Sequence, residues 1–522
     1  MLHPFAQLLH HRRIGQRGDI ADLVGLPLDV VRHADKGGFG ERRQVMPQPA
    51  RGKSDGAGRR PQGSRACHAH RHSIGPSARM FAGSERVQDT MHMKTKLWSR
   101  LGYSLLAFSC ITACGGEDSA SPTPTPPANT PPAPSPPPPS PPPVAAETLI
   151  YPTATLAERR AALDSFWQDW KRVYLREGCG GAYVDTAGDG RDTYGDSAPN
   201  TLTVSEAHGY GMLALARMAD RDNRSKMLFD EMLAFFRLHP AASGPGLMAW
   251  NQTRDCNDAP DGDSTASDGD LDIALALYLA DERWGGYAAD AAEVRQAILE
   301  REITVHNLVK LGDWATYDVY DVASRSSDFM PYNFTVFAEA GGSDAGRWDE
   351  IRSAGYAVWS DISAHYAPNT GLVPDFMVGM PDNPRPADPG FLEGDYDGYY
   401  SWNALRYPYR LAADYRRSRD PRAGESLRSI NFWIRTLTGG DPARIASTYR
   451  LDGSIPTDGQ WTGEPGWISM FAAGAIAGSG DAEADQAWMD ALWAAMVAIP
   501  VEDGDYFGNT LKLLAMIDLA EM

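Results

Sequence analysis

Apolar residues recur every three or four positions through most of residues 147–522, the spacing that places them on one face of a helix. Residues 156–176 show this pattern clearly, because polar residues surround a single apolar stripe made of Leu163, Phe166, Trp167, Trp170, Val173 and Tyr174. Such a stripe predicts an amphipathic helix on the outside of a helical fold.

Two other stretches, 209–219 and 271–280, are apolar almost all round, which is typical of a helix enclosed by other helices. The same analysis predicts further helices at 223–238, 286–305, 331–341, 345–365, 401–417, 422–437, 466–477, 482–498 and 505–521. About twelve helices that alternate between the two types predict an all-α fold. We expect an (α/α)6 toroid of six inner and six outer helices, with connecting loops at one end that frame a cleft.

The first 146 residues differ from the rest in composition. Residues 1–92 lack periodicity and predict a mis-called or disordered extension, with Met93 as the true initiator; a translated leader is the alternative. Residues 93–114 predict a bacterial lipoprotein signal peptide with Cys114 as the lipidated residue, and an ordinary cleaved signal is the alternative. Residues 115–146 predict a Pro-rich linker in extended polyproline II conformation.

The chain has 68 acidic and 49 basic residues and a formal net charge of -19. This surplus disfavours nucleic acid and anionic lipid headgroups as partners, although it also serves solubility. The predicted signal peptide leads us to expect a secreted protein anchored to the bacterial envelope, in the periplasm or at the cell surface, that meets the membrane only through a lipid on Cys114. We expect it to be a monomer.

Motifs of several enzyme classes are missing from the sequence. There is no H-E-x-x-H, no nucleotide-binding loop, no G-x-S-x-G and no C-x-x-C pair. A run of aspartates between positions 258 and 272 suggests calcium, but no register supplies the glycine and glutamate of an EF-hand. No metal and no cofactor are expected.

Carboxylates stand at the starts of the two enclosed helices, beside Gly-rich segments. Glu206 begins one of them, and Asp268 and Asp270 begin the other. In a toroid these positions would open into the cleft.

A structural alternative describes the same residues without chemistry. Ser205 and Ser267 would be N-caps, and the acids would complement the helix dipoles. A helix N-terminus lowers the pKa of a carboxyl, whereas a general acid needs it raised. Burial and the nearby Asp268 would have to outweigh the dipole at Glu206.

Two motifs resemble glycoside hydrolase family 8. Residues 205–212 match its Ser-Glu-x-x-Gly-Tyr-Gly-Met signature in full, and residues 266–284 resemble its second signature, departing only at Tyr278. The resemblance spans about residues 150–520, and two long motifs in the right order are specific. It implies a toroidal, inverting endo-glycanase in which Glu206 protonates the leaving oxygen.

By the same resemblance, Asp268 would hold a distorted sugar at the cleavage point and help to orient water. Asp270 is grouped with the substrate-binding residues, and its expected role is to support the loop at the second motif. Trp250 occupies the place of a subsite tryptophan, and Trp314 is a weaker choice, since sugar faces stack on aromatic rings. Tyr210, within the first motif, completes this group.

The general base is less clear from the sequence. Many family members carry a base aspartate where this chain has Asn403, which cannot accept a proton. The chain resembles a subgroup of the family that carries this asparagine and draws its base from an acidic loop just before it, here residues 391–398. Glu393 is the preferred base, with Asp395 and Asp397 as rivals, and Asn403 is grouped with the substrate-binding residues.

Two further predictions stay open. Arg406, also in the substrate-binding group, could bridge to a catalytic carboxylate or hold Asp414 on its own helix. Cys179 and Cys256 remain after signal removal and could form a disulfide in an oxidising exterior, or stay as buried thiols.

Taken together, these features predict a glycoside hydrolase that cleaves β-1,4 linkages of a polysaccharide, either a β-glucan such as cellulose or chitosan. The acidic surface leans slightly toward a cationic polymer without deciding the matter. A second hypothesis, motivated by Asn403, is a non-catalytic glycan-binding lipoprotein that kept the toroid and lost its base.

Overall fold

A computed structural model describes residues 148–187, 200–457 and 460–520. The predictions for residues 1–146, including the signal peptide, Cys114 and the linker, lie outside these residues and stay predictions. No helix in the part of the chain described is long and apolar enough to cross a membrane.

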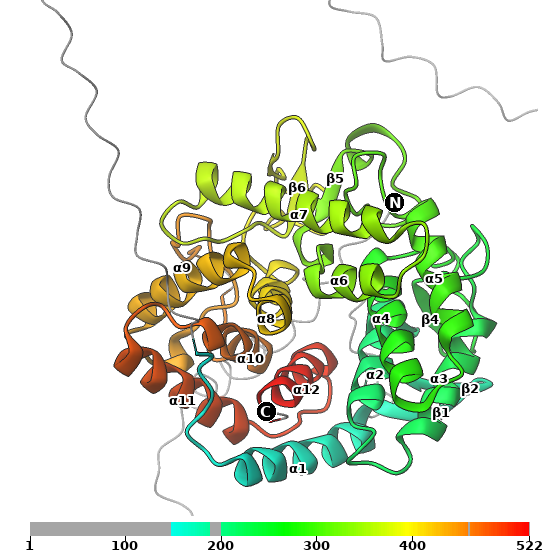
Figure 1. The fold of residues 1–522 in the computed structure, drawn as a ribbon, viewed down its shortest axis with the longest axis horizontal. Helices are drawn as coiled ribbons and strands as arrows, with labels where there is room; N and C mark the ends of the chain where they lie inside the picture. Colours follow the sequence, from blue (N-terminus) through cyan, green and yellow to red (C-terminus); the bar gives the residue numbers. More distant parts are fainter. Residues whose placement is uncertain (1–147, 188–199, 458–459, 521–522) are drawn as a thin grey trace, which may run out of the picture. The chain divides into compact units, whose positions relative to one another are not determined.

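The described residues fold into two concentric rings of helices (Figure 1). The outer ring consists of α1 (Leu156–Tyr174), α3 (Ser225–Leu238), α5 (Ala288–Arg301), α7 (Ala345–Tyr366), α9 (Pro421–Thr438) and α11 (Ala482–Ala498). The inner ring consists of α2 (Ser205–Arg217), α4 (Ser267–Trp284), α6 (Pro331–Glu339), α8 (Tyr407–Ser418), α10 (Pro465–Gly474) and α12 (Tyr506–Ala520). The predicted (α/α)6 toroid is confirmed.

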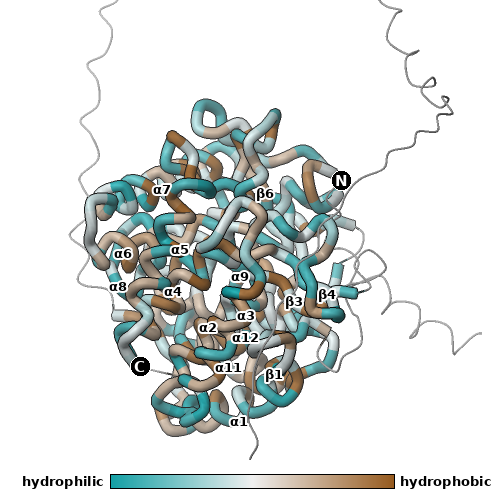
Figure 2. Tube along the Cα trace, turned by 90° about the vertical axis from the view of Figure 1, so that its right-hand side faces the viewer, coloured by the Kyte–Doolittle hydropathy of each residue, from teal (hydrophilic) through white to brown (hydrophobic). Residues whose placement is uncertain are grey.

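Burial follows the predicted division between the rings. Every residue of α10 and all of α12 except Phe507 are buried, whereas α1 buries mainly its apolar stripe. Figure 2 shows hydrophobic residues along the helices in the middle of the molecule and hydrophilic ones on peripheral segments such as α1 and α7. In α2 the only residues that are not buried are Glu206 and Arg217, one near each end of the helix.

The apolar runs that begin at Gly209 and Leu271 belong to α2 and α4, which start at Ser205 and Ser267, as expected from the acids at their starts. One predicted helix start differs clearly from the structure. Helix α8 begins at Tyr407 rather than near position 401, because a 3-10 turn, η4 (Ala404–Arg406), precedes it and Pro408 occupies its first turn.

Short strands in the loops were not predicted. Strands β1 (Leu175–Gly178) and β2 (Gly181–Val184) form a hairpin, β3 (Thr201–Val204) pairs with β4 (Asn251–Thr253), and a third antiparallel sheet joins β5 (Ala323–Arg325), β6 (Phe376–Val378) and β7 (Arg385–Pro386). None exceeds four residues, which is too short for an alternating pattern to stand out.

The ring closes where α1 packs against α12, which brings the two ends of the described chain together. Trp170 donates its indole N–H to the Thr510 hydroxyl at 3.0 Å, and the Tyr174 hydroxyl donates to the Glu502 carbonyl at 2.5 Å. A toroid of this kind therefore depends on contacts between residues more than 300 positions apart.

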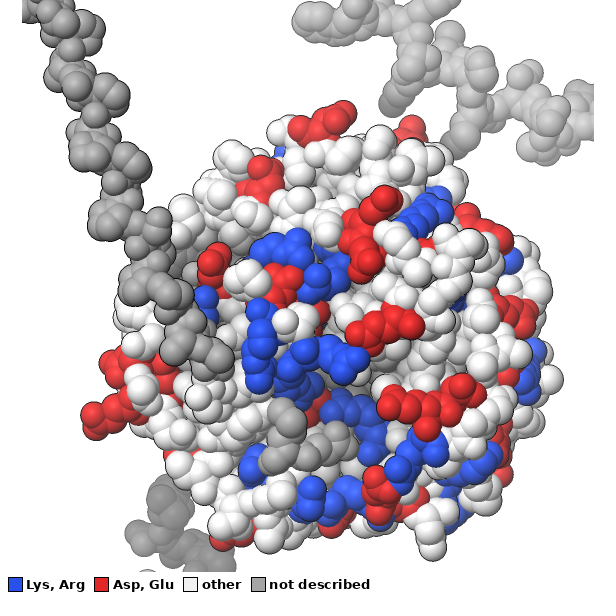
Figure 3. Space-filling view, viewed as in Figure 1, with Lys and Arg blue, Asp and Glu red and all other residues white. Residues whose placement is uncertain are grey.

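The C-terminal ends of α2, α4 and α8 line a cavity of about 640 Å³. Arg217 and Arg416 both pair there with Asp518 at 2.5 Å, and Arg417 pairs with Glu339 at 2.7 Å. Figure 3 shows Lys and Arg side chains gathered near the middle of the face seen there, among acidic side chains. Ion pairs thus hold this end of the ring, and the predicted acids lie at the opposite ends of α2 and α4.

Candidate active site

Two glycines bring the N-terminal ends of α2 and α4 together. A Cβ atom at Gly269 would lie 2.6 Å from the Ser205 carbonyl carbon, and one at Gly209 would lie 2.9 Å from the Gly269 carbonyl oxygen. Backbones can approach this closely only where side chains are absent. The glycines of the two motifs therefore place Glu206 and Asp268 side by side.

One guanidinium joins the two acids. Nη1 of Arg406 lies 2.8 Å from Glu206 Oε2 and 2.8 Å from Asp268 Oδ2, and it also donates to the Tyr210 hydroxyl at 3.0 Å. Arg406 is 1% exposed. The choice left open for Arg406 is settled by these contacts.

The other predicted partner of Arg406 is held elsewhere. Asp414 accepts hydrogen bonds from Arg352 at 2.7 Å and from the Tyr356 hydroxyl at 2.5 Å. Arg406 is therefore free to serve the two acids at the ends of α2 and α4.

The two acids differ in protonation. Burial raises the pKa of Glu206 to about 7, against the opposing charge of Arg406, and the Asp268 carboxylate raises it further. The Tyr506 hydroxyl donates to the other oxygen of Glu206 and lowers the pKa slightly. Glu206 thus holds a proton up to about neutral pH, as a general acid must.

Asp268 stays ionised. Burial pushes its pKa upward, but the charges of Arg325 and Arg406 and the Gly269 N–H, 2.9 Å from Oδ1, lower the pKa below the ordinary value. A protonated carboxyl therefore adjoins an ionised one. Arrangements of this kind serve glycoside hydrolysis, where one carboxyl gives a proton and others stabilise charge or activate water.

Comparisons with known proteins agree with this chemistry. The family model described as Glycosyl hydrolases family 8 matches residues 143–410. A Beta-glucanase from Niallia circulans is 34% identical over 368 residues, which cover 69% of this chain and 85% of that protein. The chain belongs to glycoside hydrolase family 8.

Other relatives of this family-8 chain extend the comparison. An Endoglucanase from Bacillus sp. (strain KSM-330) is 31% identical over 69% of this chain and 75% of its own length. The apo structure of a Beta-1,3-1,4-glucanase from Paenibacillus sp.X4 has a TM-score of 0.65 at 32% identity, covering 72% of this chain and 95% of that one. The chain is thus a glycoside hydrolase, which sets aside the non-catalytic binder.

In this family-8 site, Asn403 connects Arg406 to the acidic loop. Arg406 Nη2 donates to Asn403 Oδ1 at 2.9 Å, and Asn403 Nδ2 donates to Glu393 Oε2 at 2.8 Å. The buried carboxylate of Asp375 fixes the turn by accepting the N–H groups of Ser401, Asn403 and Ala404 at 2.7 to 3.1 Å. A continuous chain of hydrogen bonds therefore runs from Glu206 to Glu393.

The three acids of this loop are placed differently. Asp397 is buried and accepts the backbone N–H groups of Leu392, Glu393 and Gly394, so it holds the loop in shape. Asp395 is exposed. The side chain of Glu393 is 16% exposed and contacts Asn403, which favours it over its two rivals.

Arg325 is a site residue that sequence analysis missed. Its guanidinium lies 3.2 Å from Glu393 Oε1 and 3.2 Å from the buried Asp328, and its charge also acts on Asp268. The only signal was a charged residue between short apolar runs, which many surface loops share. The Tyr506 hydroxyl is a second partner of Glu206, and Tyr506 lies outside both family motifs.

Trp250 lies next to the proton donor. Its carbonyl accepts the N–H of Ser205 at 3.0 Å, and its indole N–H donates to the Asp261 carbonyl at 3.1 Å. Trp314 is half-buried and packs edge-on against Tyr320, with ring centroids 5.4 Å apart, in a small apolar cluster separate from the main core. Sugar stacking on either ring stays a prediction.

Three residues of the predicted substrate-binding group are buried. Tyr210 is 1% exposed and its hydroxyl accepts from Arg406, while Asp270 is 0% exposed and accepts the Met248 N–H at 2.9 Å. Asn403 is 7% exposed, and its amide is occupied by its two neighbours. The Tyr210 hydroxyl and one oxygen of Asp270 are bound within the protein, which agrees with the supporting role expected of Asp270. Asn403 is no more buried than Asp268, so a sugar contact of Asn403 stays a prediction.

The N-cap alternative is also wrong. Ser205 and Ser267 are the first residues of their helices, and the N-cap positions belong to Val204 and Ala266, whose side chains cannot accept hydrogen bonds. Both helices therefore begin without side-chain caps at the place where the two acids lie.

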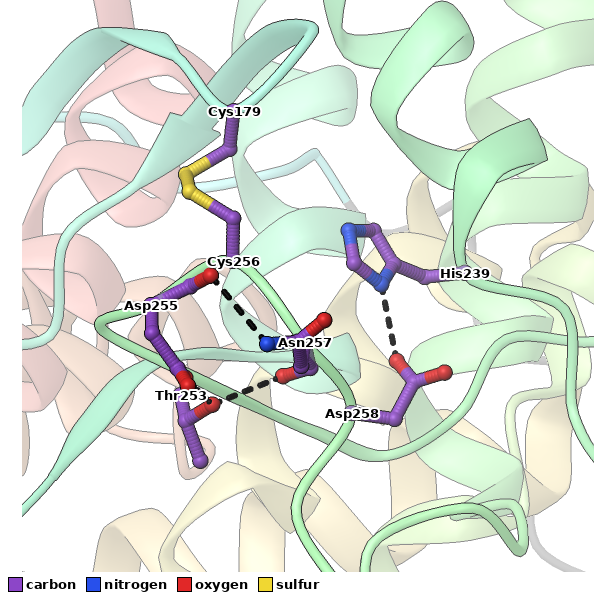
Figure 4. Close-up of a disulfide and its surroundings, with 7 residues drawn as sticks. All are labelled: Cys179, His239, Thr253, Asp255, Cys256, Asn257 and Asp258. Carbon is purple, nitrogen blue, oxygen red and sulfur yellow. Dashed lines mark hydrogen bonds and ion pairs between the residues drawn. A yellow bond between two sulfur atoms is a disulfide. The ribbon is translucent and has the colours of Figure 1, made fainter.

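A disulfide joins two loops near the site (Figure 4). Cys179, in the turn of the β1–β2 hairpin, is bonded to Cys256, which follows β4, with Cα atoms 5.4 Å apart. Asp258 in the same loop contacts His239 at 2.8 Å. Among the residues described, no group of three His, Cys, Asp or Glu side chains is arranged to hold a metal ion.

Proposed function

We propose that the chain is an endo-acting, inverting hydrolase that cleaves β-1,4 linkages in a β-glucan. The observation that carries this proposal is the pair of a protonated Glu206 and an ionised Asp268 held by one guanidinium. The printed names of the relatives, Beta-glucanase, Endoglucanase and Beta-1,3-1,4-glucanase, favour a glucan over chitosan.

In the proposed mechanism Glu206 gives its proton to the leaving glycosidic oxygen. The charge of Asp268 stabilises the oxocarbenium-like sugar as the bond breaks, and Glu393 removes a proton from the attacking water. An inverting enzyme needs its acid and base roughly 6.5–9.5 Å apart, so that a water fits between base and sugar. Arg406 and Asn403 stand in series between Glu206 and Glu393, which suits such a separation.

A panel of lichenan, carboxymethylcellulose, xylan and chitosan tests this proposal. We expect new reducing ends on lichenan or carboxymethylcellulose, with a rapid fall in viscosity because cuts occur within the chain. Proton NMR of the first products should show the α-anomer, since one displacement at a β-linked carbon inverts it. Glu206→Gln should lose roughly 10²- to 10⁴-fold in turnover while still binding the polymer.

Each contrary result changes a defined part of the proposal. Turnover of chitosan alone would mean that the substrate is chitosan and not a β-glucan. A β-anomer as the first product would mean that the mechanism is not inverting. Full activity of Glu206→Gln would require another proton donor.

A further inference from the structure

Two buried carboxyl groups interact near the start of α4, the helix that carries Asp268. Asp270 lies in the first turn of α4, Glu302 follows the last turn of α5, and both are 0% exposed. Each side chain acts on the pKa of the other as a hydrogen-bond partner. Among the residues described, neither Asp270 Oδ2 nor Glu302 Oε2 receives a hydrogen bond of ordinary geometry from an N–H or O–H group, and the Ser267 hydroxyl acts on Glu302 only more weakly than the Thr265 hydroxyl.

The remaining two oxygens are well satisfied. Asp270 Oδ1 accepts the Met248 N–H at 2.9 Å, and Glu302 Oε1 accepts the Thr265 hydroxyl at 2.5 Å. If both groups were ionised, two buried oxygens would lack donors and two like charges would adjoin. A proton on Asp270 Oδ2 that is donated to Glu302 Oε2 removes both costs.

The pair lies where three parts of the site meet. Met248 precedes Trp250 by two residues, and Thr265 precedes Asp268 by three. The Thr265 hydroxyl also accepts the Asp313 N–H at 2.9 Å, and Asp313 precedes Trp314. Through these bonds the pair fixes the two predicted subsite loops and the start of α4.

We propose that Asp270 and Glu302 share one proton, and that this pair positions Asp268 and the loops of Trp250 and Trp314, so that loss of the proton loosens the cleft. Asp270 and Glu302 are positioning residues, since neither reaches the substrate. The inference rests on the proposed role of Asp268 as a group that acts on the sugar.

The surroundings of Asp270 shift its pKa upward, as a retained proton requires. Burial raises the pKa of Asp270 well above its ordinary value, and the Glu302 charge raises it further, while the Met248 N–H lowers it. The groups that face the pair are Asp313, which raises both pKa values, and the hydroxyls of Thr265 and Ser267, which lower that of Glu302. Asp270 therefore keeps its proton at pH values well above the ordinary pKa range of an aspartate.

This shift has a defined sign for stability. Because the pKa of Asp270 is raised on folding, its contribution is fully present below the unfolded pKa of about 3.9 and is lost as the pH rises through the folded value. Alkaline pH should thus weaken both the fold and the cleft.

Asp270→Asn tests the pair, because an amide donates to Glu302 and accepts from Met248 but has no proton to lose. The wild-type logarithm of kcat/KM should fall with a slope of about −1 above the pKa of Glu206 and steepen toward about −2 once the pair loses its proton. In Asp270→Asn the slope should stay near about −1, with activity near pH 6 within about threefold of wild type. Asp270→Leu, of similar size but without polar atoms, should lose at least about tenfold.

A second measurement does not need activity. The melting temperature of the wild type should fall between about pH 6 and about pH 9, and that of Asp270→Asn should fall less. Two results would overturn the inference. One is that Asp270→Asn shows the same alkaline fall in kcat/KM and the same pH dependence of the melting temperature as the wild type. The other is that Asp270→Asn and Asp270→Leu have equal activities. Turnover by the wild type and its loss in Glu206→Gln decide the proposed function separately.

Discussion

At the scale of single residues, Asn403 and Glu393 form a matched pair. The guanidinium of Arg406 only donates hydrogen bonds and an ionised carboxylate only accepts them, whereas an amide offers one group of each kind. Asn403 therefore accepts from Arg406 and donates to Glu393. An aspartate at this position, expected in many family members, would place two like charges in contact.

This complementarity predicts that the role of general base can be transferred from position 393 to position 403. Glu393→Gln should lower kcat/KM by roughly 10²-fold or more, because no carboxylate remains to take a proton from water. Adding Asn403→Asp to that variant should restore part of the activity, since the new carboxylate receives hydrogen bonds from Arg406 and from the glutamine amide. Asn403→Asp alone should be impaired, because two adjoining carboxyls share a proton near neutral pH.

The measurement is kcat/KM on the best polymer of the panel for all three variants. Asp395→Asn serves as the matched control, since that rival is exposed and should retain wild-type turnover. Full activity of Glu393→Gln, together with loss of activity in Asp395→Asn, would transfer the base to Asp395.

At the scale of helices and strands, the sequence was informative where elements are long. Glu206 and Asp268 could be placed at the starts of α2 and α4 because each of the two specific motifs lies where a long apolar run begins. Arg325 could not, because it enters the site from β5, a strand of three residues. The contact of Asp270 with Glu302 joins two helix termini, and no pattern along the chain encodes such a meeting.

The close approach of α2 and α4 gives a prediction at this scale. Gly269→Ala places a Cβ atom 2.6 Å from the Ser205 backbone, so the helices must separate. We expect a loss of about 1–3 kcal/mol in the free energy of unfolding and a larger loss in turnover, because Glu206 and Asp268 move apart. Thermal melts and kcat/KM check both effects.

Gly346→Ala is the matched control. Gly346 lies in the first turn of α7, and a Cβ atom there would meet nothing within 4 Å. That substitution should leave turnover unchanged and stabilise the helix slightly, by up to about 1 kcal/mol. Equal effects of the two substitutions would show that the glycine at 269 is not needed for close packing.

At the scale of the whole molecule, long-range contacts hold the ring and its cleft. Helices α1 and α12 close the toroid, and the Cys179–Cys256 bond joins segments 77 residues apart. Both cysteines have left-handed backbones, with φ of 52° and 62°, which costs roughly 1–2 kcal/mol for residues other than glycine. The backbone of Cys179 and Gly180 suits the two-residue turn of the β1–β2 hairpin, and the cross-link ties this turn to the loop after β4.

Removing this bond should affect stability more than chemistry. A cross-link across a segment of this length restricts the unfolded chain, and Cys179→Ser with Cys256→Ser should lower the free energy of unfolding by roughly 2–4 kcal/mol. KM should rise modestly, because the loop of Cys256 adjoins β4 and Trp250, whereas kcat should change little because Glu206 and Asp268 are fixed by α2 and α4. A reductant should lower the melting temperature of the wild type toward that of the double variant and leave the variant unaffected. If the reductant lowers both melting temperatures equally, the bond is not what stabilises these loops, and the packing of the β1–β2 hairpin against α3 would have to carry that role.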